Sequence, residues 1–418
     1  MKNKRSQVIN LGCRLNIYEG EIIKSLIKKN KIKNYTIINS CAVTSEAEKK
    51  VRYEIRKAKK KFPKNKIVLT GCAAQIDPEK YKKMSEVDSI IGNNEKTNEK
   101  IWKNIHNLHN HVGNIFSIKE THEHIVEKFE GKSRAYIEIQ QGCDHRCTFC
   151  IIPYGRGNNR SVPVGVIIER IKILVNNGYK EIVLTGVDIT DYGKDLPGAP
   201  NLFQLCRRVL NLVPNLNHLR LSSLDCGEIK EDFWEIVNNK RLMPYFHLSI
   251  QSGNDMILKR MKRRHSKKQV IEFCQKVKKI RKDAIFGADL IAGFPTETKE
   301  MFEDTIDLIN KSNLTHLHVF PYSSRPLTPA SLMPQIPLNI VKERAKILRE
   351  IGNEQLQNYL NNQIGKSTKV LIEKTNQYQS IGKSEYFTNI IINNKIKEGK
   401  IVNCIITGTE KNFSKASL

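Results

Sequence analysis

Three cysteines lie within the stretch Gln141-Gly142-Cys143-Asp144-His145-Arg146-Cys147-Thr148-Phe149-Cys150, directly after the strand-like residues 135–139. Three thiolates on one loop can bind three irons of a cubane iron–sulfur cluster, and because no fourth cysteine is nearby, one iron stays open to bind another molecule. Zinc sites usually bring four ligands as paired C-x2-C or histidine elements, so the spacing favours a cluster over zinc. The loop therefore predicts a reactive centre.

The chain around this loop repeats a strand and then a helix from about residue 133 to 355. Six such units suit a partial parallel β/α barrel better than a full eight-stranded one, and the carboxyl ends of barrel strands carry the chemistry. The cysteine loop follows the first strand, so it should lie at that end. The predicted strands are Ala135–Ile139, Glu181–Thr185, His218–Ser222, Phe246–Ile250, Ile285–Ile291 and His316–Phe320.

The first segment, to about residue 115, alternates short apolar strands with helical stretches, which indicates an open parallel α/β sheet. Each of its first three strands ends on a cysteine, at Cys13, Cys41 and Cys72. Because the carboxyl ends of neighbouring parallel strands share one edge, we expect these cysteines to converge there. Three such cysteines favour a second cluster over simple packing. The polar residues 93–130 look like a connector.

The last 57 residues, after a helical stretch at Val341–Leu360, read as short strands with no helix between them. This pattern predicts a small five-stranded barrel of the OB type. Residues 362–418 carry nine Lys and four Glu, a net charge of +5. That charge suits an RNA-binding appendage, and a stabilising cap is the equal alternative.

The composition favours a nucleic-acid partner. The 418 residues include 70 Lys and Arg against 43 Asp and Glu, a formal charge of +27, which attracts a polyanion. Richness in Lys, Asn and Ile together also fits AT-biased coding, so some of the excess can be plain solvated surface. No signal peptide and no apolar run of membrane-spanning length is present in the sequence, so we expect a cytoplasmic protein without a membrane partner.

Four motifs together resemble those of the methylthiotransferases, which are radical S-adenosylmethionine enzymes. The resemblance covers essentially the whole chain and implies an amino-terminal domain with a second cluster, a radical S-adenosylmethionine core and a carboxy-terminal TRAM domain, here at residues 3–115, 129–358 and 362–418. The motifs are Leu11-Gly12-Cys13-Arg14-Leu15-Asn16, Ile38-Asn39-Ser40-Cys41-Ala42-Val43-Thr44, Thr70-Gly71-Cys72-Ala73-Ala74-Gln75 and the loop at Cys143, Cys147 and Cys150.

Three further stretches, Phe149–Gly157, Leu258–Ser266 and His318–Ser323, point within this family to the MtaB branch. That branch places a methylthio group on carbon 2 of N6-threonylcarbamoyladenosine at tRNA position 37. The MiaB branch, which acts on isopentenyladenosine at the same position, is the first alternative. A non-catalytic iron–sulfur protein that binds RNA is the second.

The resemblance also implies cofactors and their residues. Two 4Fe-4S clusters and S-adenosylmethionine are expected, with Phe149 beside the adenine of S-adenosylmethionine. Thr185, Gly186 and Asp188 occupy the place where relatives hold its methionine amino group. Gln251 and Asp289 should face the site from strand ends, although such residues often only make turns. The expected cluster ligands are Cys143, Cys147 and Cys150 for the radical cluster and Cys13, Cys41 and Cys72 for the second.

The implied partners are the tRNA anticodon stem-loop, an electron donor such as a flavodoxin or ferredoxin, and a sulfur donor. Two basic stretches, residues 259–282 and 49–61, are candidates to follow the phosphates of the anticodon stem, and a solvated helix face is the alternative for each. One residue departs from the family pattern. Leu327 stands where glycine is usual, so we expect the backbone there to avoid positive φ.

Overall fold

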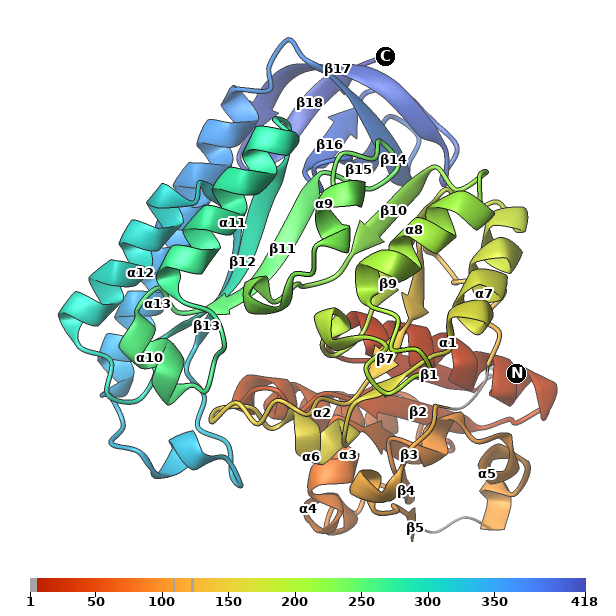
Figure 1. The fold of residues 1–418 in the computed structure, drawn as a ribbon. Helices are drawn as coiled ribbons and strands as arrows, with labels where there is room; N and C mark the ends of the chain where they lie inside the picture. The colour runs from red at the N-terminus through yellow and green to blue at the C-terminus, as the bar shows by residue number, and fades with distance from the viewer. Residues whose placement is uncertain (1–5, 108–109, 122–123) are drawn as a thin grey trace.

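The structure, a computed structural model, describes residues 6–107, 110–121 and 124–418. The predicted start of the first domain at residue 3 lies outside these residues. A parallel sheet, a partial barrel and a closed barrel follow one another along the chain, which confirms the predicted α/β fold class. Figure 1 shows the partial barrel between the amino-terminal sheet (red and orange) and the carboxy-terminal barrel (blue).

The amino-terminal sheet is entirely parallel, with its strands in the order β1-β2-β3-β4-β5. Every residue of β2 is buried, as expected of a central strand covered on both faces. The Thr44 hydroxyl accepts from the amide of Ala47 and so caps the second helix. The elements are β1 Gln7–Asn10, α1 Arg14–Lys29, β2 Tyr35–Ser40, α2 Ser45–Lys61, β3 Lys66–Gly71, α3 Cys72–Ile76, α4 Pro78–Lys82, β4 Ser89–Ile91, α5 Glu99–Lys103 and β5 Asn110–His111.

The polar stretch 93–130 is more than the connector that the sequence predicts. Its first half supplies α5 and β5, and Trp102 on α5 is 0% exposed. Lys96 is also 0% exposed, because its ammonium is paired with the carboxylate of Glu19 on α1. Polar composition was misleading here, since a lysine that has a buried partner belongs to the interior.

The partial barrel contains the six predicted strands, in two three-stranded parallel sheets of order β10-β9-β6 and β11-β12-β13. Isolated parallel bridges, Leu219 to Leu242 and Leu224 to Leu248, connect the two sheets. The strands are β6 Ala135–Glu138, β9 Glu181–Thr185, β10 His218–Leu221, β11 Tyr245–Gln251, β12 Ile285–Ala292 and β13 Leu314–Pro321, with the small hairpin β7 Gln140–Gln141 and β8 Arg160–Ser161 beside the cysteine loop.

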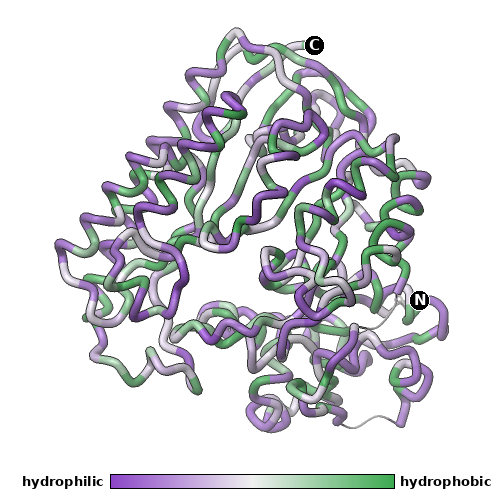
Figure 2. The backbone as a smooth tube through the Cα atoms, viewed as in Figure 1, coloured by the Kyte–Doolittle hydropathy of each residue, from purple (hydrophilic) through white to green (hydrophobic). Residues whose placement is uncertain are grey.

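Amphipathic helices cover the outside of this barrel. On α11 the buried residues are Val270, Phe273, Cys274 and Val277, one face of a helix. Figure 2 shows hydrophilic and hydrophobic residues mixed along the helices of this side. The helices are α6 Ile152–Arg156, α7 Val164–Asn176, α8 Leu202–Leu212, α9 Asp232–Ile236, α10 Asp255–Arg260, α11 Lys267–Ile280 and α12 Lys299–Lys311.

The carboxy-terminal part is a closed five-stranded barrel of order β14-β15-β16-β18-β17, as predicted. The long helix α13 Leu338–Asn361 connects it to the partial barrel. Val370, Ile372, Ile390 and Ile406 are central to its core. The strands are β14 Ser367–Thr375, β15 Ser380–Ser384, β16 Asn389–Ile392, β17 Ile401–Glu410 and β18 Phe413–Ser417. In the described part of the chain, every helix is too short or too polar to cross a membrane.

The expectation for Leu327 was wrong. Its φ is 71°, in the region that glycine favours. The side chain is 60% exposed, so it meets little steric resistance there. The Tyr154 hydroxyl donates to the Leu327 carbonyl at 3.0 Å, which helps to hold this turn in place.

Candidate functional site

Cys13, Cys41 and Cys72 converge at the carboxyl edge of the amino-terminal sheet. Cys13 precedes α1, Cys41 follows β2 and Cys72 begins α3. Gly12 lies so close that a Cβ built on it would be 2.9 Å from the sulfur of Cys41. Burial and the neighbouring thiols of Cys72 and Cys13 raise the pKa of Cys41 to about 12. The three thiols therefore share one site, and Cys13 is the exposed member.

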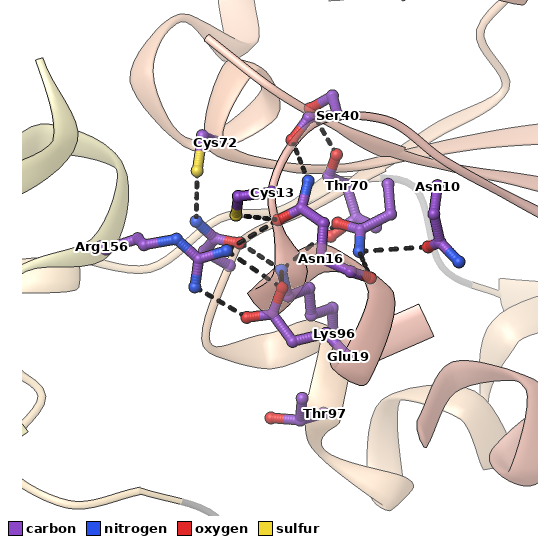
Figure 3. Close-up of polar contacts among 12 residues, drawn as sticks. Asn10, Cys13, Asn16, Glu19, Ser40, Thr70, Cys72, Lys96, Thr97 and Arg156 are labelled. Carbon is purple, nitrogen blue, oxygen red and sulfur yellow. Dashed lines mark hydrogen bonds and ion pairs between the residues drawn. The ribbon is translucent and has the colours of Figure 1, made fainter. Parts of the chain in front are cut away.

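A buried polar network lies beneath these cysteines (Figure 3). Arg156, from α6 of the partial barrel, donates to both carboxylate oxygens of Glu19 at 2.9 and 3.1 Å. Lys96 donates to the same carboxylate at 2.6 Å. Burial alone would raise the pKa of Glu19, but the two cations lower it to about 2. One ionised carboxylate therefore faces two buried cations.

The network reaches the cysteines through asparagines. Arg156 donates to the side-chain oxygen of Asn16 at 2.7 Å, and the Cys13 thiol donates to the same oxygen at 3.8 Å. Asn93 donates to the Cys72 sulfur at 3.4 Å. The excess positive charge of Arg156 and Lys96 is suited to metal-bound thiolates, which are negative. This donor set and its surroundings fit an iron–sulfur cluster.

The second trio, Cys143, Cys147 and Cys150, lies on the loop between β7 and α6. The Thr148 hydroxyl anchors this loop by donating to the carbonyl of Arg260 at 2.8 Å. Burial raises the pKa of all three thiols, that of Cys150 to about 12. Arg263 donates to the Cys147 sulfur at 3.8 Å. Thiols of this kind ionise when a metal binds them, so this loop also fits a cluster.

A cavity of about 240 Å³ lies between the amino-terminal domain and the partial barrel. Val43 and Thr44, just after Cys41, line it from the amino-terminal domain, and Cys150 lines it from the partial barrel. Of the predicted cofactor residues, Phe149, Gln251 and Asp289 also line this cavity. The structure thus brings three of the six predicted cofactor-binding residues together at one cavity.

The other three predicted residues, Thr185, Gly186 and Asp188, lie at the carboxyl end of β9, outside the lining of this cavity. Asp188 is 3.0 Å from Nε2 of His145, a residue of the cysteine loop. Burial raises the pKa of Asp188, and the nearby Asp225 carboxylate adds to the shift. The β9 end therefore contacts the cysteine loop directly.

Sequence reasoning missed two histidines beside Asp289. His247 on β11 and His318 on β13 lie 3.0 and 3.3 Å from the Asp289 carboxylate. Although Asp289 is buried, these histidines hold its pKa well below the usual range. The Tyr245 hydroxyl and Nδ1 of His247 are hydrogen-bonded at 2.6 Å. The sequence places both histidines on predicted strands, but it does not reveal the strand register that aligns them with Asp289.

Sequence reasoning also missed an aromatic side chain of the carboxy-terminal barrel that packs against the partial barrel. Phe387, between β15 and β16, stacks on Tyr245 at 5.5 Å between ring centroids. Four cations surround its ring at 4.6 to 5.7 Å: Arg14, Arg134, Arg220 and Lys383. We call this group the Phe387 chamber. It joins residues of all three parts of the chain, so no local sequence pattern could reveal it.

Comparisons with known proteins agree across the chain. The Radical SAM superfamily matches residues 137–309, and an uncharacterized protein family, UPF0004, matches residues 5–92. The threonylcarbamoyladenosine tRNA methylthiotransferase MtaB of Rickettsia prowazekii is 51% identical over 417 residues, which is 100% of this chain and 98% of the relative. The tRNA-2-methylthio-N(6)-dimethylallyladenosine synthase of Ehrlichia canis is 32% identical, over 91% of each chain.

Among solved structures, the radical S-adenosylmethionine methyltransferase TsrM of Kitasatospora setae, with tryptophan and a cofactor analogue bound, has a similar fold. The TM-score is 0.53 with 13% sequence identity, over 76% of this chain and 68% of the other. At this identity the likeness supports the fold alone.

Proposed function

This chain belongs to the radical S-adenosylmethionine methylthiotransferase family, and we propose that it places a methylthio group on carbon 2 of N6-threonylcarbamoyladenosine at position 37 of tRNA. One observation carries the chemistry: a single cavity is lined by Cys150 of the partial barrel and by Val43 and Thr44, which follow Cys41 in the amino-terminal domain. The full-length relative at 51% identity supports the choice of nucleoside over isopentenyladenosine, whose modifying relative is 32% identical.

The cofactors are S-adenosylmethionine and 4Fe-4S clusters, and we assign Cys143, Cys147 and Cys150 to one cluster and Cys13, Cys41 and Cys72 to the other. When bound, these groups supply the one-electron cleavage of S-adenosylmethionine and the sulfur to be transferred. The chain's own residues position and shield them. Arg263 places a positive charge beside the Cys147 sulfur.

Residues of the cavity have two roles in this proposal. Phe149 and Ile291 give the cavity an apolar wall, which excludes water from a reactive site. Asp289 stays ionised through His247 and His318 and offers a hydrogen-bond acceptor in the same cavity. Gln251 lies at a bulge where β11 shifts register, and its side-chain amide lines the same cavity as Asp289. We propose that these groups, with Thr185, Gly186 and Asp188 at the β9 end, orient S-adenosylmethionine.

The substrate and the donors complete the proposal. We propose that the tRNA anticodon stem-loop binds along the basic stretches 49–61 and 259–282, and that the enzyme works in the cytoplasm with its tRNA. An electron donor such as a flavodoxin or ferredoxin, and a sulfur donor, are required by the chemistry.

Mass spectrometry of tRNA nucleosides from a deletion strain tests the substrate. We expect 2-methylthio-N6-threonylcarbamoyladenosine to disappear and its unmethylthiolated precursor to accumulate. Loss of the methylthio group from isopentenyladenosine instead would contradict the proposal. The non-catalytic alternative is tested separately, because only an enzyme releases 5′-deoxyadenosine from S-adenosylmethionine under reducing conditions.

Iron analysis tests the ligand assignment. Reconstituted protein should hold about eight irons per chain, the content of two 4Fe-4S clusters. Replacing Cys13, Cys41 and Cys72 together by Ala should lower this to about four irons and leave the other cluster. The matched control is Cys404→Ala, because Cys404 is buried in the carboxy-terminal barrel. An unchanged iron content in the triple variant would refute the assignment.

A further inference from the structure

We propose that Arg14 binds the carboxylate of the threonylcarbamoyl group and so selects this nucleoside at tRNA position 37. The inference rests on the proposed function and deepens it. Arg14 is the first residue of α1 and directly follows Cys13 in the chain. Cys13 is exposed, and Arg14 is partly buried.

Arg14 is a cation without a partner. Within residues 6–107, 110–121 and 124–418, its guanidinium makes no ion pair or hydrogen bond, and it lies over the face of the Phe387 ring, 5.7 Å from the centroid. A guanidinium carries five N–H donors that match the two oxygens of a carboxylate. Because Arg14 is partly exposed, these donors are open to water and to a ligand that can replace it.

Each of the other cations of the Phe387 chamber has at least one partner. Arg134 and Arg220 share the carboxylate of Glu181, each with a nitrogen within 3.1 Å of it. Arg134 also reaches Glu373 at 3.1 Å. Lys383 donates to the Phe387 carbonyl at 3.1 Å. Among the four cations of the chamber, Arg14 alone makes no ion pair or hydrogen bond with the described residues.

The charge balance of the chamber favours an anion. Four cations surround the Phe387 ring, and their ion pairs use two carboxylates, Glu181 and Glu373. Burial and the neighbouring Lys383 lower the pKa of His316, at the edge of the chamber, to about 3, so this histidine is neutral. A ligand that brings one negative charge would offset part of the excess.

The chemistry of the nucleoside matches this position. Carbon 2 and the N6 nitrogen of adenine are separated by only two ring atoms, N1 and C6. If carbon 2 lies at the site of Cys13, Cys41 and Cys72, the N6 substituent begins two ring atoms away, and Arg14, the residue after Cys13, is a cation toward which it can extend. The threonylcarbamoyl group ends in a carboxylate, whereas an isopentenyl group has no charge and would leave the guanidinium unpaired. A site built to bind a charged group rejects an analogue that lacks it.

Binding of short RNAs to reconstituted enzyme tests the inference. Three anticodon stem-loops differ only at position 37: N6-threonylcarbamoyladenosine, its methyl ester and unmodified adenosine. For the native enzyme we expect the ester to bind about 10- to 100-fold more weakly than the acid, the range for a lost charge-assisted pair. Equal affinity for acid and ester would overturn the inference without any variant, so protein folding is not at issue.

Variants then assign the effect to Arg14. In Arg14→Gln the acid should lose roughly 10- to 100-fold in affinity, and the ester less than about threefold, because the two changes remove one interaction. Arg14→Lys keeps the charge and should fall between. The matched control is Arg208→Gln, an exposed arginine on α8. If Arg14 contacts a backbone phosphate instead, the affinity of all three RNAs for Arg14→Gln falls by the same factor, and the inference fails.

A separate measurement tests the proposed function. If native reconstituted enzyme forms no methylthio product on the RNA that carries N6-threonylcarbamoyladenosine, the proposed function fails, whatever the binding affinities of the three RNAs. Discrimination between acid and ester in such an enzyme would still support a carboxylate site, whereas product without discrimination would reject the site and keep the function.

Discussion

Replacing Glu19 by Gln should strongly destabilise the protein. Glu19 is 0% exposed and is the carboxylate that Arg156 and Lys96, themselves 2% and 0% exposed, share. Its oxygens accept from Lys96 at 2.6 Å and from Arg156 at 2.9 and 3.1 Å. Glutamine keeps one acceptor oxygen but no charge, so the variant leaves two cations buried together.

The size of the effect follows from two opposing contributions. Removing one partner of a buried ion pair typically costs about 3–5 kcal/mol. Glu138 recovers part of this: its pKa is raised to about 7 by burial and by Glu19, and it ionises more readily once Glu19 is neutral. We therefore expect a net loss of about 3 kcal/mol, or roughly 6–12 °C in the first thermal transition of the apo protein.

Thermal melts of apo and reconstituted protein provide the assay, because a chain of several domains does not unfold in one two-state step. The loss should be smaller in reconstituted protein, where metal-bound thiolates lie beside the same cations. Glu99→Gln is the control, because Glu99 pairs with Lys29 and Lys103 at the surface, where ion pairs contribute little to stability.

A Glu19→Gln melting temperature within about 2 °C of the Glu99→Gln control would refute this reasoning. Adding Arg156→Met to Glu19→Gln offers an internal check. The double variant removes one of the two unpaired cations, so its loss should be clearly less than the sum of the single losses. Additive losses would mean that the two residues act independently, contrary to the geometry.

Glu138→Gln should become more stable than the native protein as pH rises. The pKa of Glu138 in the folded protein is about 7, above its usual value of 4.5, so ionisation of this buried carboxyl lowers the stability of the native protein between pH 4.5 and 7. At pH 8 the free energy of unfolding of the variant should therefore exceed that of the native protein by about 2–3 kcal/mol. Parallel pH profiles in thermal melts would contradict this. Leu327→Gly should be neutral or raise stability by up to about 1 kcal/mol, because glycine accepts positive φ freely but gains entropy when unfolded; a clear drop in melting temperature would argue against it. Phe387→Ala should lower stability by about 1–2 kcal/mol, less than the loss for a core phenylalanine, because Phe387 is only partly buried. Tyr378→Ala, at a 78% exposed site, is its control, and equal melting temperatures would show that the chamber is not structural.

The positions of both cysteine trios were predictable because they depend on local pattern and one topological rule. A run of apolar, β-branched residues that ends on a cysteine marks a strand end, as at Thr70-Gly71-Cys72. Parallel strands share an edge, so three such ends had to meet. Pairing of β1, β2 and β3 in sequence order fulfilled this condition. The six barrel strands followed from the same kind of pattern.

The polar interior was not predictable for a physical reason. Lys96 and Glu19 are 77 residues apart in the sequence, and each reads as a surface residue until the other is placed beside it. His247, Asp289 and His318 lie on three strands, and only the barrel register aligns them. Phe387 depends on how the carboxy-terminal barrel docks. Pairing across domains leaves no periodic signal in the chain.

The same polar interior explains how two sites on different domains keep a fixed relation. Arg156 ends the helix that begins just after Cys150, and Asn16 and Glu19 lie on the helix that begins just after Cys13. A hydrogen bond between these helices therefore joins the two loops within a few residues of each trio. Apolar packing tolerates small shifts, whereas a buried charged network is satisfied in one geometry and costly in others. The network thus holds the two trios at one separation, which a transfer between them requires.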